Sequence, residues 1–169
     1  MAIDLGPNPL ALERQVCFAL SIASRSVIAI YRPLLEPHGL THPQYLVLLA
    51  LWDSAPRSVT ELSRVLRAEP ATLSPLLKRL ETTGYISRGR SAEDERQLAV
   101  DLTGAGRDLR AEAEKIPYRV VEELGMGLGE LEDLHAALTT VIRATRGAPA
   151  GSPGRRGSPQ DLDGGERGG

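Results

Sequence analysis

Two short helices separated by a tight break leave this chain few folds to adopt. The capping box S-V-T-E predicts a helix over Val59–Leu66, and a break follows at residues 67–70. The next run, A-T-L-S-P-L-L-K-R-L-E-T-T-G, places its leucines on one helical stripe and ends at Gly84, a residue typical of helix C-termini. This pattern starts the second helix at Thr72, so that Pro75 falls in the first turn, where its missing N–H is harmless.

Two short strands follow the second helix. The predicted strands are Tyr85–Arg88 and Arg96–Leu102, since apolar residues alternate along the latter, and the charged turn 89–95 joins them. The order helix, helix, strand, turn, strand predicts a winged helix-turn-helix. With the helical patterns on either side of this unit, the predicted fold class is mainly α (α+β).

Helical spacing of apolar residues flanks this unit on both sides. Thr41 and Thr103 have the character of N-caps, and the segment after Thr41 is apolar nearly all round, which predicts a buried helix. The predicted flanking helices are Leu10–Leu35, Pro43–Ser54, 103–124 and Glu130–Arg146. A composition rich in glycine and proline predicts a disordered tail over 147–169, and we expect a flexible N-terminus over 1–9.

Basic residues concentrate in one part of a chain whose net charge is −2. Residues 56–96 hold eight basic and six acidic side chains, so the rest of the chain carries the acidic excess. On the second helix, small, hydroxylated and basic residues lie opposite the leucine stripe, as a helix in a major groove requires. The candidate DNA contacts are Thr72, Ser74, Pro75, Lys78 and Arg79, with Arg88 and Arg90 in the strand region. An isolated basic pair is more often a solvated surface, but these residues follow one another along a single unit.

The chain lacks the usual marks of an enzyme or a membrane protein. We find no apolar run long enough to span a bilayer, no N-terminal signal pattern and one cysteine, Cys17. We therefore expect a cytoplasmic protein. The three histidines lack metal-ligand spacing, and C-x-x-C, G-x-S-x-G and glycine-rich phosphate-loop motifs are missing, so we expect no catalysis, metal or cofactor.

The motifs T-L-S-P-L-L-K-R-L-E, G-Y-I-S-R and R-S-A-E-D-E-R-Q together resemble the MarR family of winged-helix repressors. The resemblance covers Leu10–Ile142 and implies a homodimer of one domain, residues 10–146. Helices over 10–36 and 103–146 would form the dimer, and the lobe 56–102 would read a palindromic operator in double-stranded DNA. Repression is the mode of regulation that the resemblance implies.

The same resemblance assigns further residues of the lobe. It implies that the recognition helix begins nearer Pro70, with Pro75 inside it. It places Arg96 on the wing as a DNA contact. Asp94 would hold the wing by pairing with an arginine, since a carboxylate that faced a phosphate would repel it.

The motifs L-E-R-Q-V-C-F-A-L, Y-R-P-L-L and L-T-H-P-Q-Y resemble the OhrR branch of that family, whose repressors respond to organic hydroperoxides. The resemblance implies that a hydroperoxide oxidises the Cys17 thiolate to sulfenic acid and that the dimer then releases DNA. It also implies that Tyr31 of the partner subunit holds the thiolate. Fourteen residues separate Cys17 from Tyr31, about 21 Å along one helix, so the two cannot touch within one subunit.

The chain departs from that branch at two positions. His42 and Ser21 stand where the branch has tyrosines. An imidazole at His42 still offers a hydrogen bond to a thiolate, but a histidine in the first turn of a helix fits the position equally well without a redox role. Cys17 taken alone fits a buried small side chain on an amphipathic helix, and the surrounding motif favours the redox role.

Two other functions stay open. In one, a MarR-type repressor responds to a small anionic or aromatic ligand in a pocket lined by Arg25, His42 and Tyr45, and substitution of the cysteine leaves that response intact. In the other, the chain is a helical protein-interaction module. Neutralising Lys78 and Arg79 would then change neither DNA affinity nor its salt dependence.

Overall fold

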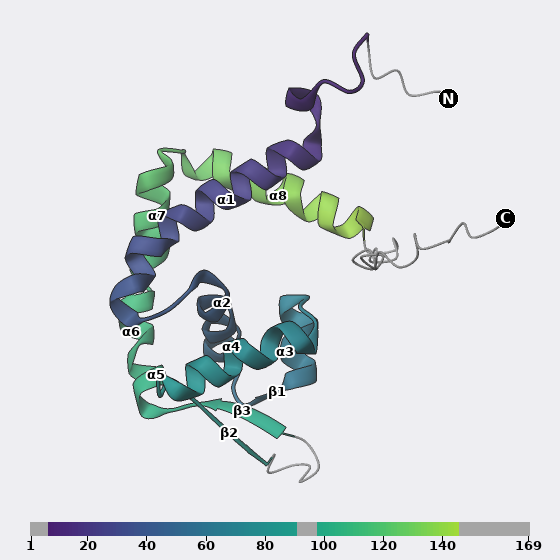
Figure 1. Cartoon of the computed structure of the whole chain (residues 1–169). Coiled ribbons are helices and arrows are strands. Elements are labelled where there is room, and N and C mark those ends of the chain that lie inside the picture. The colour runs from purple at the N-terminus through teal and green to yellow at the C-terminus, as the bar shows by residue number, and fades with distance from the viewer. Residues whose placement is uncertain (1–6, 91–97, 146–169) are drawn as a thin grey trace, which may run out of the picture. The chain divides into compact units, whose positions relative to one another are not determined.

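The computed structural model describes residues 7–90 and 98–145, which belong to two compact units (Figure 1). The first unit ends at Met126 and the second begins at Gly127. The predicted tail, 147–169, most of the charged turn and the first six residues lie outside the described residues. The elements confirm the predicted fold class, because the chain is mainly helical with a small sheet in a winged helix-turn-helix.

The first long helix, α1 (Val16–Leu35), begins later than the predicted Leu10. A single 3-10 turn, η1 (Leu12–Arg14), precedes it, and the extended backbone of Gln15 (φ −79°, ψ 116°) separates the two. The Gln15 side chain fixes this break, because its Nε2 donates to the carbonyl oxygen of Pro9 at 2.8 Å. The predicted start is therefore wrong, since local hydrogen bonding interrupts the helix there.

Helix α1 is apolar and yet mostly exposed. Leu35 is its one buried residue. The stretch Val16–His38 has a mean hydropathy of 1.3 over an 18-residue window, so by length and composition it is able to cross a membrane. The prediction that no apolar run is long enough for this is wrong. The helix thus presents an apolar surface that the described residues of its own unit leave largely exposed.

The next helix, α2 (His42–Asp53), is the buried helix that the sequence predicts, shifted by one residue at each end. Its N-cap is Thr41, as predicted, whose backbone N–H and hydroxyl both donate to Oε1 of Gln44, at 2.8 and 2.9 Å. A 3-10 turn, η2 (Glu36–His38), links α1 to this cap and ends at Gly39, which has a left-handed φ of 66°. The buried residues of α2 include Tyr45, Val47, Leu48 and Leu51.

The strand β1 (Arg57–Ser58) leads into α3 (Val59–Leu66), whose bounds are those predicted. The capping box is confirmed, because the Glu61 N–H donates to Oγ of Ser58 at 3.2 Å and the Ser58 N–H donates to Oε2 of Glu61 at 2.7 Å. Arg67, at a left-handed φ of 51°, ends the helix. The break before the next helix is therefore tight.

The recognition helix of the motif is α4 (Pro70–Thr82). The start predicted from the pattern, Thr72, is wrong, and Pro75 lies inside the helix, as the resemblance implied. The ring of the first residue presets φ for a helix, and the Thr72 N–H already donates to the carbonyl oxygen of Glu69 at 2.9 Å. The side chains that α4 buries are Leu73, Leu77 and Leu80.

The sheet has three strands in the order β1-β3-β2. Strand β2 (Ile86–Arg90) pairs antiparallel with β3 (Leu98–Leu102), and β1 pairs with the other side of β3. Val100 lies opposite both Arg57 and Arg88, and its side chain is buried in the core. The predictions missed β1, because two residues are too few to show an alternating pattern.

Three short helices replace the single helix predicted over 103–124. They are α5 (Gly104–Asp108), α6 (Arg110–Ala113) and α7 (Ile116–Leu124). Thr103 caps α5 as predicted, since its Oγ1 accepts from the Gly106 N–H at 3.1 Å. Pro117, in the first turn of α7, has no N–H with which to continue a helix from α6, which accounts for the second break. Helix α7 packs against α1.

The second unit contains α8 (Leu128–Ala144), where the sequence predicts a helix over Glu130–Arg146. None of its described residues is buried. An amphipathic helix gains most of its stability from covering its apolar face, so α8 requires a partner surface. That apolar face consists of Leu131, Leu134, Leu138 and Ile142.

Candidate nucleic-acid interface and cysteine site

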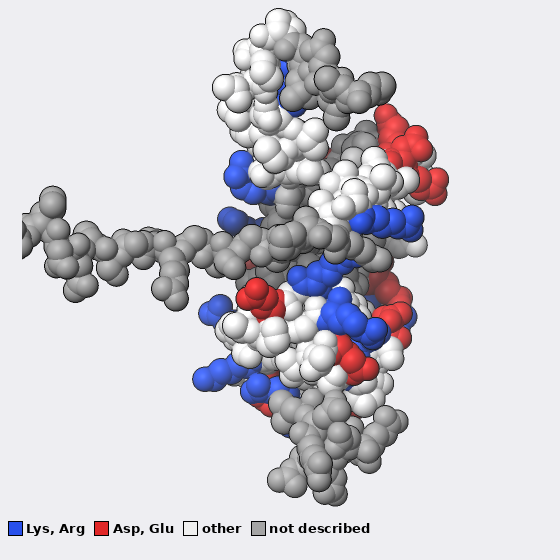
Figure 2. Space-filling view, turned by 90° about the vertical axis from the view of Figure 1, so that its right-hand side faces the viewer, with Lys and Arg blue, Asp and Glu red and all other residues white. Residues whose placement is uncertain are grey.

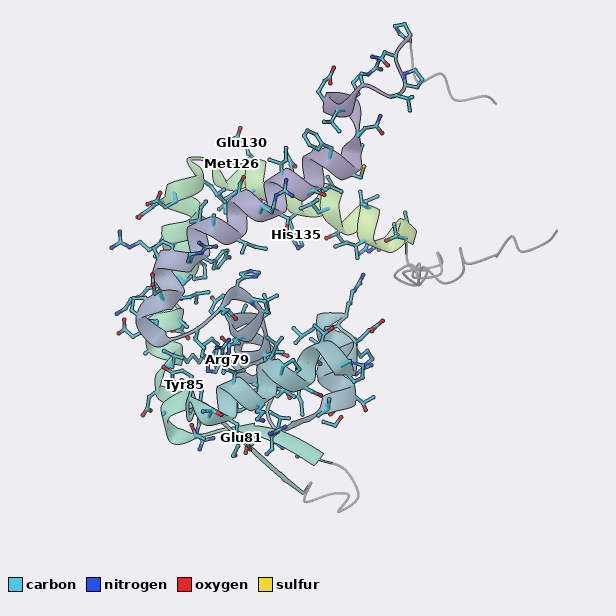
Figure 3. All side chains as sticks on the ribbon, viewed as in Figure 1. Arg79, Glu81, Tyr85, Met126, Glu130 and His135 are labelled. Atoms are coloured by element: carbon cyan, nitrogen blue, oxygen red, sulfur yellow. The ribbon has the colours of Figure 1, made fainter. Side chains whose placement is uncertain are left out.

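The candidate DNA contacts of the recognition helix lie together on the exposed side of α4. All of them are exposed, while Leu73, Leu77 and Leu80 on the other side of the helix are buried. Among the described residues, Lys78 and Arg79 form no ion pair, so both cations are available to phosphates. Figure 3 labels Arg79 on this helix. The contacts on this exposed side are Thr72, Ser74, Pro75, Lys78 and Arg79.

One predicted DNA contact, Arg88, already has a partner in its own lobe. Its Nε donates to Oε2 of Glu81 at 2.9 Å, and its Nη2 donates to the same oxygen. This hydrogen bonding holds the pKa of the Glu81 carboxyl below its usual value and raises the pKa of Arg88. The sequence pattern did not single out Glu81, an acid three residues after Lys78 on an otherwise basic helix.

The structure does not describe the side chains of the other residues predicted for the wing. Asp94 and Arg96 lie outside the described residues, as does the side chain of Arg90. Figure 2 shows Lys and Arg side chains standing beside Asp and Glu side chains on the face it displays, rather than a continuous basic surface. Among the described residues, the candidate basic surface for DNA is therefore the exposed side of α4 with Lys78 and Arg79.

Cys17 occupies the first turn of α1 and is exposed. The alternative prediction, a buried small side chain, is therefore wrong for the single chain. The Cys17 carbonyl oxygen accepts a hydrogen bond from Oγ of Ser21 at 2.8 Å. Ser21 thus directs its hydroxyl to the backbone of its own helix.

Tyr31 and His42 meet in an aromatic cluster that α1 and α2 form together. Their ring centroids are 4.9 Å apart and their planes meet at 63°, so one ring stands edge-on to the other. Tyr45 lies 5.8 Å from Tyr31, and Trp52 lies 6.2 Å from Tyr45, again between ring centroids. Cys17, fourteen residues before Tyr31 in α1, does not belong to the cluster of its own chain.

Partial burial sets the protonation of this cluster. It lowers the pKa of His42, which favours the neutral imidazole at neutral pH. Burial also raises the pKa of Tyr31 and of Tyr45, and the neighbouring Tyr31 raises that of Tyr45 further. The phenols therefore keep their protons, and the cluster offers O–H and N–H donors to an anion such as a thiolate.

A separate cavity of about 340 Å³ lies where the end of α1 and the start of α2 approach α4. It brings Arg32 and Arg79 together with Gln44, and it does not include the predicted ligand residues Arg25, His42 and Tyr45. The full lining is Arg32, Glu36, Gly39, Leu40, Thr41, Gln44 and Arg79. Within residues 7–90 and 98–145, no group of three or more histidine, cysteine or acidic side chains has the arrangement of a metal site.

Comparison with known proteins connects this geometry to regulators of transcription. The family model described as "Transcriptional regulator SarA/Rot" matches residues 29–113. The chain is 41% identical over 144 residues to the HTH-type transcriptional regulator TtmR of Methylorubrum extorquens, covering 83% of this chain and 74% of TtmR. It is 38% identical over 133 residues to the organic hydroperoxide resistance transcriptional regulator of Bacillus subtilis, covering 79% of this chain and 90% of that protein.

A solved structure gives a likeness in three dimensions. Reduced AbfR bound to DNA, from Staphylococcus epidermidis, superposes with a TM-score of 0.64 at 32% identity, covering 79% of this chain and 93% of AbfR. The likeness therefore spans the winged lobe and the helices that flank it.

Proposed function

We propose, since this chain belongs to the SarA/Rot and MarR family of winged-helix transcriptional regulators, that it is a dimeric DNA-binding repressor whose Cys17 senses organic hydroperoxides. The matched family and the relatives named above are regulators and not enzymes. We expect the protein in the cytoplasm, where its DNA partner is.

The arrangement of Cys17, Tyr31 and His42 is the observation that carries this proposal. The thiol is exposed at one end of α1, and the donor pair Tyr31 and His42 stands half-buried near the other end. Two copies of α1 running antiparallel would bring the thiol of one subunit to the donor pair of the other. The hydroperoxide-resistance regulator of Bacillus subtilis, at 38% identity, supports the same reading.

Exposed apolar helices support the dimer on which this site depends. Helix α1 buries one residue, and α8 buries none, although both carry apolar faces. Leu134, Val141 and Ile142 of α8 are between 41% and 45% exposed. Apolar surface of this extent is typical of an interface, so we propose that helices within 10–36 and 103–146 pair with those of a second copy.

The proposed chemistry is a two-electron oxidation. The Cys17 thiolate attacks one oxygen of the hydroperoxide, the O–O bond breaks, and an S–O bond forms. The sulfur is oxidised to sulfenic acid, and the peroxide is reduced to an alkoxide that takes a proton from water. Because the anion that Tyr31 and His42 stabilise has then disappeared, the dimer helices rearrange and the recognition helices leave the DNA.

DNA recognition is assigned to the lobe 56–102. We propose that α4 enters the major groove with Thr72, Ser74, Pro75, Lys78 and Arg79 on the DNA side. Two lobes of a dimer would read half-sites of a palindrome about one helical turn apart. The proposed wing contacts are Arg90 and Arg96, with Asp94 holding the wing in place. Arg88, which the sequence also predicts as a DNA contact, is hydrogen-bonded to Glu81.

Release of DNA by a hydroperoxide tests this function. Reduced protein is titrated into a labelled fragment of the promoter beside its own gene, at fixed salt, and fluorescence anisotropy is followed while an organic hydroperoxide is added. We expect the wild-type protein to bind and then release, and Cys17→Ser to bind and stay bound. Release of both proteins, or of neither, contradicts the redox function.

A second candidate is a repressor that responds to a small anionic ligand. The observation in its favour is the cavity of about 340 Å³ that both Arg32 and Arg79 of the recognition helix line. A ligand bound there would compete with DNA for the Arg79 guanidinium. The Cys17→Ser protein separates the two candidates, because a ligand sensor keeps its response without the thiol.

A further inference from the structure

We infer that Glu81 is a positioning residue for DNA binding: it clamps Arg88 at the base of the wing and so sets the angle between the recognition helix and the wing. The inference rests on the DNA-binding function above. In this inference the Arg88 guanidinium binds a carboxylate of its own lobe and does not contact a DNA phosphate.

The connection that the clamp spans is short and bends at a glycine. Between α4 and β2 stand Thr83, Gly84 and Tyr85, and Gly84 has a left-handed φ of 85°. Two hydrogen bonds secure the turn itself. The Tyr85 N–H donates to the carbonyl oxygen of Leu80 at 3.0 Å, and Oγ1 of Thr103 donates to the carbonyl oxygen of Gly84 at 2.6 Å. These bonds lie close to the pivot, at the start of the outgoing strand.

The clamp acts further from the pivot. Along β2 the side chain of Ile86 is buried, that of Ser87 is exposed, and that of Arg88 is again partly covered, so Ile86 and Arg88 face α4. Two donors of the Arg88 guanidinium meet one carboxylate oxygen of Glu81, which fixes the orientation of both side chains. Because Arg88 lies opposite Val100 of β3, the clamp connects α4 to the part of β2 that pairs with β3.

The ion pair between Glu81 and Arg88 also removes a negative charge from a surface that approaches DNA. The Glu81 side chain lies one helical turn after Lys78, close to the side of α4 that carries the DNA contacts. An unpaired carboxylate there would repel phosphates, and Arg88 neutralises it. The two side chains are 37% and 27% exposed, so water screens the pair less than a fully solvated one.

The inference is tested by measuring how tightly the protein binds its operator when Glu81, Arg88 or both are replaced by an uncharged residue. We would measure affinity by anisotropy over a series of salt concentrations for wild type, Glu81→Gln, Arg88→Gln and the double variant. The matched control is Glu114→Gln, which breaks the exposed Arg110–Glu114 ion pair away from the lobe. We expect each lobe variant to bind about threefold to tenfold more weakly, the double variant to be no weaker than either single one, and the salt slope to stay unchanged.

The sign of the Glu81→Gln effect separates the two roles of Arg88. If Arg88 contacts a phosphate, removing the acid strengthens binding or leaves it unchanged, and Arg88→Gln lowers the salt slope by about 0.9 for each phosphate that the arginine had neutralised. That result overturns the inference while leaving DNA binding intact. Failure of the wild type to bind its operator would instead overturn the proposed function.

A variant that is less stable would also bind DNA more weakly. Amide hydrogen exchange of the protein without DNA distinguishes that case from loss of the clamp. Amide hydrogen exchange of β2 should be faster in Glu81→Gln than in wild type, while amides of α2 keep their protection and Glu114→Gln changes neither. Unchanged exchange in β2 overturns the clamp, and so does a loss of protection throughout the lobe.

Discussion

The imidazole of His42 stands edge-on against the phenol ring of Tyr31, with ring centroids 4.9 Å apart, although the two residues come from different helices. The pair offers hydrogen-bond donors to an anion. Cys17 lies on the same helix as Tyr31, about 21 Å away along its axis. In the proposed sensor, the thiol of a second subunit therefore completes the site.

Partial burial of His42 should make folding depend on pH. Burial lowers its pKa in the folded protein from the ordinary value of 6.5, while the unfolded chain keeps that value. As pH falls below 6.5 the unfolded state therefore binds the proton first, and the free energy of unfolding decreases until the folded imidazole is protonated as well. Urea unfolding at pH 7.5 and 5.5 should show this loss in wild type and a smaller loss in His42→Gln.

The control for this prediction is His135→Gln, at an exposed position of α8. It should keep the wild-type pH dependence. An equal pH dependence in the His42→Gln protein would contradict the role of burial.

The cations of the recognition helix should control affinity by neutralising phosphates. Lys78→Gln and Arg79→Gln should each weaken operator binding and lower the salt slope by about 0.9 for each phosphate that is no longer neutralised. Anisotropy titrations between low and moderate salt measure both quantities. Arg119→Gln, an exposed substitution on α7, is the matched control and should change neither. Unaltered slopes in the α4 variants would mean that this face does not meet DNA.

Helix α5, which follows the wing, should tolerate no side chain at Gly106. A methyl group there would overlap the carbonyl oxygen of Tyr85, and Trp52 Nε1 donates to the Gly106 carbonyl at 2.8 Å from the other side. Gly106→Ala should lower the free energy of unfolding by about 1–3 kcal/mol. Gly104→Ala, in the same helix with open space around it, is the control and should cost little. Equal effects of the two substitutions in urea unfolding would contradict this packing.

The sequence predicts an element well where a local signal sets its end. The bounds of α3 follow from Ser58 and Glu61, and the caps Thr41 and Thr103 are where the pattern places them. The pattern misplaces the start of α4 because Pro75 suggests a first turn, whereas the helix tolerates a proline in its second turn. It misplaces the start of α1 because the side-chain hydrogen bonds of Gln15 override the apolar spacing.

Contacts between distant parts of the chain are what the sequence does not reveal. The strand β1 exists because Arg57 pairs with Val100, 43 positions away, and two residues carry no periodicity of their own. The partnership of Glu81 with Arg88 depends on the turn at Gly84. The motif suggests several site residues, and the structure gives the distance between two of them only where both are described. Tyr31 and His42 are such a pair.

A mixed dimer tests the shared sensor most directly. One subunit carries Cys17→Ser and the other Tyr31→Phe, so the remaining thiol faces an intact tyrosine only if the site forms across subunits. We would measure the rate at which that thiol reacts with an organic hydroperoxide, beside wild type and the Tyr31→Phe homodimer. A sensor shared between subunits predicts the wild-type rate in the mixed dimer. A rate as slow as that of the Tyr31→Phe homodimer would contradict it.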